Sequence, residues 1–147
     1  EELYMAKYLI MVSHGDFAPG LHSAVKMMTG DRPDVLSTSL KDGMGADEFQ
    51  ENFRNLVKDF TEEDEVILLA DIQGGSPFTK ANEVLGETGL ISRSLIITGM
   101  NMPLAVTAVL MKDNMDLPML KEVILSEGHT GLSCFEVTVD DEDDDDL

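Results

Sequence analysis

The sequence predicts an α/β fold around a mostly parallel sheet, with its candidate chemistry at the carboxyl ends of two strands. Short apolar runs alternate with amphipathic stretches, which is the pattern of repeated strand–helix units. Residues 8–12 and 66–70 are strongly apolar, and each run leads into a polar segment with glycine. In open α/β sheets, ligands bind at the carboxyl ends of strands, where the strand order reverses. We therefore expect His14 and Asp71, which follow these runs, to face one crevice.

Five segments have the length and apolar character of strands. Residues 65–70 are apolar on both sides, so we expect a central strand there. The second segment is less apolar and is expected at a sheet edge. The fifth precedes an acidic run, and its pattern is consistent with an antiparallel edge strand or with pairing to another chain. The predicted strands are residues 7–13, 34–40, 65–70, 94–98 and 131–139.

Five amphipathic stretches between and after these strands predict helices. The first two are expected at residues 17–28 and 47–60, where apolar side chains recur at helical spacing. The other three begin with a polar N-cap candidate and a proline in the first turn. These N-cap candidates are Ser76, Asn101 and Asp116. Three glycines are expected to end helices, namely Gly30, Gly86 and Gly128.

Length and composition restrict the possible classes of protein. A chain of 147 residues is expected to form one domain, which we place at residues 1–139. Cys134 is the only cysteine, so an intramolecular disulfide is excluded, and we expect its side chain to be small, apolar and buried. No apolar run approaches the roughly 20 residues of a membrane helix, and the start of the chain does not resemble a signal peptide. We therefore expect a cytoplasmic protein with no direct membrane insertion.

The chain is strongly negative, and a large part of its negative charge lies in one segment near the end. The net charge is −19, and residues 140–146 are seven consecutive acids, which leaves −12 on the rest of the chain. We expect residues 140–147 to form a solvated, disordered tail; docking to a basic partner is the alternative. Phosphates would be repelled by this charge, so nucleic-acid binding is not expected.

His14 and Asp71 have the residue types that nucleophilic catalysis by an imidazole requires. An aspartate beside a histidine holds one ring nitrogen protonated and leaves the other free as a nucleophile. Ser13 and Gly15 are small neighbours that leave the ring accessible. Gly74, Gly75 and Ser76 add backbone N–H groups, a hydroxyl and a helix N-terminus, which together suit a phosphoryl group. Such transfer relies mostly on positioning and electrostatics, and we expect no metal and no cofactor.

Three segments together resemble the IIA component of the mannose-family sugar phosphotransferase system, which depends on phosphoenolpyruvate. They are residues 13–18 (SHGDFA), 71–78 (DIQGGSPF) and 99–103 (GMNMP), and the resemblance covers about residues 7–135. It implies a three-layer αβα sandwich with strand order 2-1-3-4. It also implies that His14 is phosphorylated, that Asp71 orients His14 and that Ser76 contacts the phosphoryl group.

The resemblance also implies partners. The phosphoryl group would come from the phosphocarrier HPr and pass to a separate IIB component, and through it to the IIC/IID membrane permease. A homodimer that exchanges its last strand is implied as well, which would explain residues 131–139. Partner docking is expected at Phe17, Met100, Asn101 and Met102, around the predicted crevice.

Other interpretations remain open from the residues alone. Asp71 after the third strand also suits a phospho-aspartate receiver, although such a module needs two acids after the first strand, where Ser13 and His14 stand. A flavin or nucleotide site lacks a glycine-rich phosphate loop after that strand. His22 and His129 are expected to be structural, and His14, His22 and Asp71 do not have the spacing of a known metal site.

Overall fold

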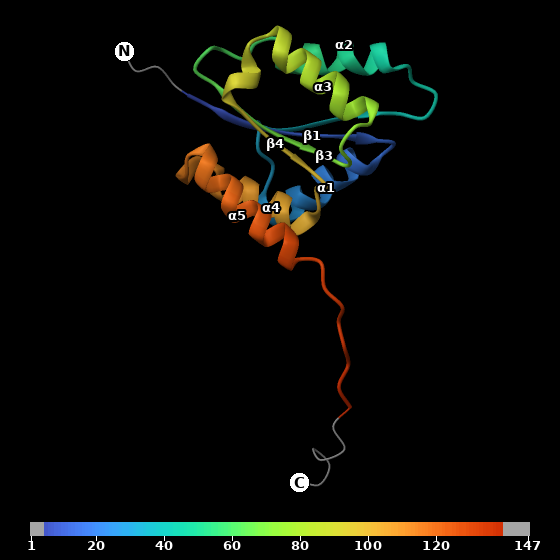
Figure 1. Cartoon of the computed structure of the whole chain (residues 1–147), viewed down its shortest axis with the longest axis vertical. Helices are drawn as coiled ribbons and strands as arrows, with labels where there is room; N and C mark the ends of the chain where they lie inside the picture. The colour runs from blue at the N-terminus through green and yellow to red at the C-terminus, as the bar shows by residue number, and fades with distance from the viewer. Residues whose placement is uncertain (1–4, 140–147) are drawn as a thin grey trace.

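A four-stranded parallel sheet forms the centre of the computed structural model, which describes residues 5–139 (Figure 1). Its strand order is β2-β1-β3-β4, as the resemblance implied. The inner strands β1 and β3 supply most of the fully buried strand residues. The strands are β1 (Lys7–His14), β2 (Val35–Leu40), β3 (Glu65–Ala70) and β4 (Ser94–Thr98).

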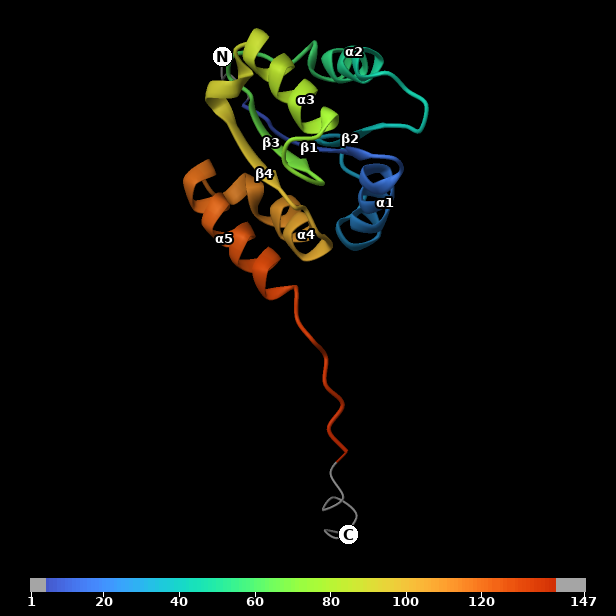
Figure 2. The same cartoon turned by 45° about the vertical axis from the view of Figure 1, so that its right-hand side comes forward.

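Helices cover both faces of this sheet, with α2 and α3 on one face and α1, α4 and α5 on the other (Figure 1 and Figure 2). Alternate residues of β1 enter the two cores: Leu9 and Met11 lie in one cluster, Ile10 and Val12 in the other. The α-helices are α1 (Phe17–Thr29), α2 (Ala46–Val57), α3 (Ser76–Glu87), α4 (Met102–Met111) and α5 (Leu117–Thr130). Two 3₁₀ helices, η1 (Leu90–Arg93) and η2 (Lys112–Asn114), precede β4 and α5.

The strand order reverses between β1 and β3. The chain leaves β1 through α1 on one face of the sheet and leaves β3 through α3 on the other face. Because the two connections diverge, the carboxyl ends of β1 and β3 are left uncovered between them. This position is where the sequence places His14 and Asp71.

Helix termini confirm two of the predicted N-caps and correct one. Asn101 and Asp116 accept hydrogen bonds from the backbone N–H of Leu104 and Met119, each at 3.0 Å. The N-cap of α3 is Gly75, and Ser76 is the first residue of the helix, so the predicted cap at Ser76 is wrong.

Gly128 does not end α5, which continues to Thr130. The glycine is buried inside the helix, where an added Cβ would lie 2.9 Å from Leu104 Cδ1. Its place in the sequence therefore reflects the close packing of α5 on α4 rather than a helix stop.

The expected fifth strand is not confirmed. Residues 131–139 form no strand, and they extend away from the body of the molecule after α5 (Figure 1 and Figure 2). Leu132, Phe135, Val137 and Val139 are all more than three-quarters exposed. Cys134 is exposed as well, because this segment does not join the sheet, so the prediction that it is buried is wrong.

The acidic tail that the sequence predicts at residues 140–147 lies outside the described residues. Over residues 5–139, none of the helices has the length and apolar character needed to cross a bilayer.

Candidate functional site

His14 is the last residue of β1, at the point where the strand order reverses. Its register partner is Leu40 at the end of β2, and the next residue, Gly15, donates a backbone hydrogen bond to Leu40 O at 2.8 Å. Gly15 turns the chain with a φ of 54°, a conformation that favours glycine, and α1 begins two residues later. The His14 side chain remains 46% exposed.

Asp71 follows β3 and lies between the ends of β1 and β4. Its backbone N–H donates to Val12 O, and its carbonyl accepts from Gly99 N. One carboxylate oxygen, Oδ2, lies 2.9 Å from the His14 backbone nitrogen and 2.8 Å from the ring Nδ1. The other oxygen, Oδ1, accepts from Ile72 N at 2.8 Å. The two predicted residues are therefore in direct contact, although 57 positions separate them in the sequence.

These hydrogen bonds determine the charge of Asp71. Burial raises the pKa of the Asp71 carboxyl, but hydrogen bonds from the His14 backbone, the His14 ring and Ile72 N outweigh it, so the net pKa is lowered. Asp71 is thus ionised at neutral pH and can only accept hydrogen bonds. The proton in the contact must belong to His14 Nδ1. The other ring nitrogen, Nε2, makes no hydrogen bond to any residue in the described range.

The start of α3 lies against the free edge of this ring. A Cβ built on Gly75 would lie 3.1 Å from His14 Nε2, so Nε2 is close to the N-cap of the helix. The first N–H groups of a helix have no partner within it and favour an anion. Gly74 has a φ of 89°, which turns the chain into this cap, and the Ser76 hydroxyl is on an exposed residue beside it. The arrangement suits a doubly charged group attached to Nε2.

Ser13 does not take the position expected of a phosphoryl-binding residue. Its side chain is fully buried, and Oγ accepts a hydrogen bond from Ala18 N at 2.6 Å while it donates to His14 O at 3.0 Å. Its alternation with His14 along β1 points it to the α1 side of the sheet. Ser13 therefore anchors the first turn of α1, and the position of its hydroxyl does not support the predicted phosphoryl-binding role.

The expected docking residues divide into exposed and buried ones. Phe17 and Met102 are exposed, as a docking role requires, whereas Met100 is only 4% exposed and packs in the core. The Asn101 side chain bonds to Leu104 N and Gly128 O, so it connects α4 and α5. Ile72, which the sequence analysis did not single out, is exposed beside Gly75 and the ring. Its place as the one large apolar residue in the polar segment 71–76 could have indicated that its side chain is exposed at the site.

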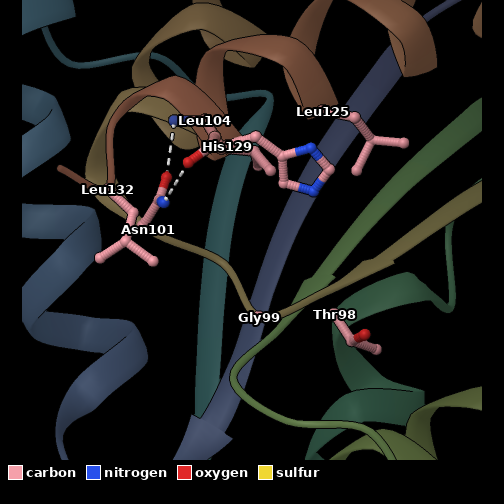
Figure 3. A pocket seen from close by; sticks show the side chains of 8 residues that line it. Thr98, Gly99, Asn101, Leu104, Leu125, His129 and Leu132 are labelled. Atoms are coloured by element: carbon pink, nitrogen blue, oxygen red, sulfur yellow. Dashed lines mark hydrogen bonds between the residues drawn. The ribbon is translucent and has the colours of Figure 1, made fainter.

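Neither of the other histidines joins the pair. His22 Nδ1 lies 2.7 Å from Ser37 Oγ, between α1 and β2, and burial lowers the pKa of His22 more than Asp31 raises it. His129 lines a separate cavity of about 540 Å³ beside the end of β4 (Figure 3). Leucines from α4, α5 and the following segment line the same cavity, together with Thr98 and Asn101.

Comparison with known proteins identifies relatives over most of the chain. The family model described as PTS system fructose IIA component matches residues 8–125, a range that includes His14 and Asp71. The PTS system fructose-specific EIIA component of Bacillus subtilis (strain 168) is 28% identical over 109 residues, which are 74% of this chain and 73% of that protein.

Solved structures share the fold. The phosphotransferase system component EIIA from Streptococcus agalactiae has a TM-score of 0.76 at 23% identity, covering 87% of this chain and 96% of that one. The PTS IIA protein associated with the fucose utilization operon from Streptococcus pneumoniae has a TM-score of 0.72 at 28% identity, covering 90% and 96%. The mannose/sorbose specific IIA subunit from Enterococcus faecalis has a TM-score of 0.73 at 20% identity, covering 92% and 98%.

The lowered pKa of Asp71 predicts a pH-dependent cost of Asp71→Asn. The carboxylate stabilises the fold above its unfolded-state pKa of about 3.9, and this contribution is lost as the pH falls through the lower folded-state value. We expect Asp71→Asn to reduce the free energy of unfolding by about 1 kcal/mol at pH 7. The difference from wild type should shrink below pH 4, as measured by urea unfolding at pH 7, 5, 4 and 3. Asp59→Asn, at an exposed aspartate, is the control; a cost of Asp71→Asn that is equal at pH 3 and pH 7 would contradict the assignment.

Proposed function

Because this chain belongs to the family of PTS system fructose IIA components, it is a IIA component of the sugar phosphotransferase system, and we propose that His14 carries its phosphoryl group. The observation that supports this residue most directly is the 2.8 Å contact between His14 Nδ1 and Asp71 Oδ2. It leaves one ring nitrogen protonated and one with a free lone pair, in a ring that is nearly half exposed.

The proposed step is a direct transfer of the phosphoryl group from HPr to His14. The lone pair of His14 Nε2 attacks the phosphorus of phospho-HPr, a new N–P bond forms, and the electron pair of the broken bond to phosphorus returns to the carrier. The Nδ1 proton stays on the ring, so the product imidazole carries positive charge. The Asp71 carboxylate stabilises that charge where it develops, which is the main way in which a protein accelerates phosphoryl transfer.

The phosphoryl group on Nε2 would lie at the start of α3. We assign its oxygens to the backbone N–H groups of residues 74–76 and to the Ser76 hydroxyl, which are close to the ring edge or exposed beside it. Gly15 follows His14 with a φ of 54°, and its backbone N–H is bonded to Leu40 O, so its proposed part is to turn the chain past the ring. Each helix N-terminus favours an anion by roughly 0.3–1 kcal/mol.

Partner docking is proposed around the same opening. Phe17 begins α1, three residues after His14, and Ile72 follows Asp71; both apolar side chains are exposed. Met102, at the start of α4, is exposed as well, but it lines a hollow with Met28 and Pro103 rather than the opening beside His14, and we keep it as a docking residue only for its flexible side chain. We propose that HPr and then the IIB component use this surface in the cytoplasm, and that IIB passes the group on toward the IIC/IID permease.

A homodimer is proposed from the unpaired edge of β4 and the segment that follows α5. Phe135, Val137 and Val139 alternate with polar residues, which is the pattern of a half-buried strand, yet they are exposed in the single chain. Within residues 5–139, β4 has a strand partner only on its β3 side. Unpaired strand edges with apolar neighbours readily accept another strand. We propose that residues 131–139 of one subunit pair with β4 of the other.

Phosphorylation assays test the assignment of His14. Incubation with HPr, its upstream kinase and phosphoenolpyruvate should label the wild-type chain on histidine, with a bond that is labile to acid and stable to base. His14→Ala should abolish this label, and Asp71→Ala should slow labelling by about 10²-fold, because the ring loses its fixed tautomer. His22→Ala and His129→Ala are controls that should be labelled at the wild-type rate.

Two results would contradict this assignment. Labelling of His14→Ala at the wild-type rate would place the acceptor elsewhere. An acid-stable label on aspartate, formed from acetyl phosphate in the presence of Mg²⁺, would favour the receiver-like alternative at Asp71.

Analytical ultracentrifugation tests the exchanged dimer. We expect the wild-type protein to sediment as a dimer and Phe135→Ser to shift the equilibrium toward the monomer, because Phe135 would lose its apolar contacts with the second subunit. Thr138→Ser, which alters a residue on the other side of the segment, should sediment as the wild type does. A wild-type protein that remains monomeric at micromolar concentration would contradict the proposal.

A further inference from the structure

Gly75 leaves no room for a side chain beside His14. A Cβ built at this position would lie 2.6 Å from His14 Cε1 and 3.1 Å from Nε2. Carbon atoms in favourable contact are about 3.5–4.0 Å apart, so a methyl group here would displace the ring by about 1 Å. The backbone of Gly75 has a φ of −84° and a ψ of 169°, which any residue adopts. The glycine is therefore required for space and not for its backbone conformation.

Displacement of the ring by such a contact would stretch its bond to Asp71. Nδ1 lies 2.8 Å from Asp71 Oδ2, and the same oxygen accepts the His14 backbone N–H at 2.9 Å. The carboxylate is held in turn through Oδ1 by Ile72 N. Since hydrogen bonds of this type span about 2.7–3.2 Å, a shift of about 1 Å exceeds what the contact tolerates. Ile72 Cδ1 lies 3.7 Å from the same Cβ position, which is an ordinary van der Waals contact.

We propose that Gly75 is a positioning residue for phosphoryl transfer. Its bare α-carbon lets the Cε1–Nε2 edge of His14 rest on the start of α3 while Nδ1 stays bonded to Asp71. Gly75 thereby allows the His14 ring to keep its orientation while it lies close to the N–H groups that receive the phosphoryl oxygens. This inference rests on the proposed function of His14.

The chain contains a matched control. Gly45 is the N-cap of α2, with a φ of −75° and a ψ of 153°, close to the geometry of Gly75 at the N-cap of α3. Apart from its two chain neighbours, no described residue has an atom within 4 Å of a Cβ built on Gly45. Gly45→Ala therefore measures the cost of alanine at a helix N-cap, and the difference between Gly75→Ala and Gly45→Ala isolates the contact with His14.

The test combines the kinetics of labelling by phospho-HPr with ¹⁵N NMR of the His14 ring. We expect Gly75→Ala to lower kcat by about a hundredfold at an unchanged KM for the carrier, since misplacement by about 1 Å costs that much. The ring nitrogens of this variant should show a mixture of tautomers, whereas Gly45→Ala should match the wild type in both measurements. Equal kcat and equal ¹⁵N shifts in the two variants would overturn the proposal.

A double-mutant cycle keeps the proposal testable if Gly75→Ala is unstable. The stability cost of Gly75→Ala should fall to that of Gly45→Ala in a His14→Ala background, because the displaced ring is absent there. An undiminished cost would overturn the contact with His14. If the wild-type chain accepts no phosphoryl group from phospho-HPr, the proposed function fails, and the ¹⁵N shifts decide separately whether Gly75 orients the ring.

Discussion

A single carboxylate oxygen connects the two halves of the site. Asp71 Oδ2 accepts both the backbone N–H and the ring N–H of His14, so it fixes the residue and the orientation of its side chain together. Ionisation of Asp71 is favoured by these same bonds, which lower its pKa despite burial. The consequence is an imidazole with a defined proton and a free nitrogen. Everything proposed for this surface depends on that contact.

The fold explains why this contact forms between distant parts of the chain. β1 and β3 pair in parallel, with Val12 opposite Ala70, so the residues that follow them emerge side by side. The two helices that leave these strands lie on opposite faces of the sheet, which keeps the crevice open. The start of α3 then returns to the ring, and Gly75 allows the close approach. The strand order, the directions of the two helices and the absence of a side chain at Gly75 thus together determine the position of the His14 ring.

The sequence predicted what local patterns control, and it failed where packing between distant elements decides. Apolar runs located the inner strands β1 and β3, because buried parallel strands are continuous in hydrophobicity, and the weaker pattern of β2 matches its place at the sheet edge. Gly128 looked like a helix stop, but contact with α4 explains it. Ser13 and Met100 lie next to exposed site residues in the sequence, yet alternation along β1 and packing under α4 turn them inward. Residues 131–139 have a strand pattern whose proposed partner lies in another subunit.

The isomer of phosphohistidine formed on the wild-type protein tests the central claim most directly. The Asp71 contact occupies Nδ1, so the account predicts that the phosphoryl group is attached to Nε2 of His14. ³¹P and ¹⁵N NMR of the protein phosphorylated by phospho-HPr identify the bonded nitrogen through the phosphorus–nitrogen coupling. A phosphoryl group on Nδ1 of His14 would contradict the account, because Asp71 and the incoming phosphorus would then require the same atom.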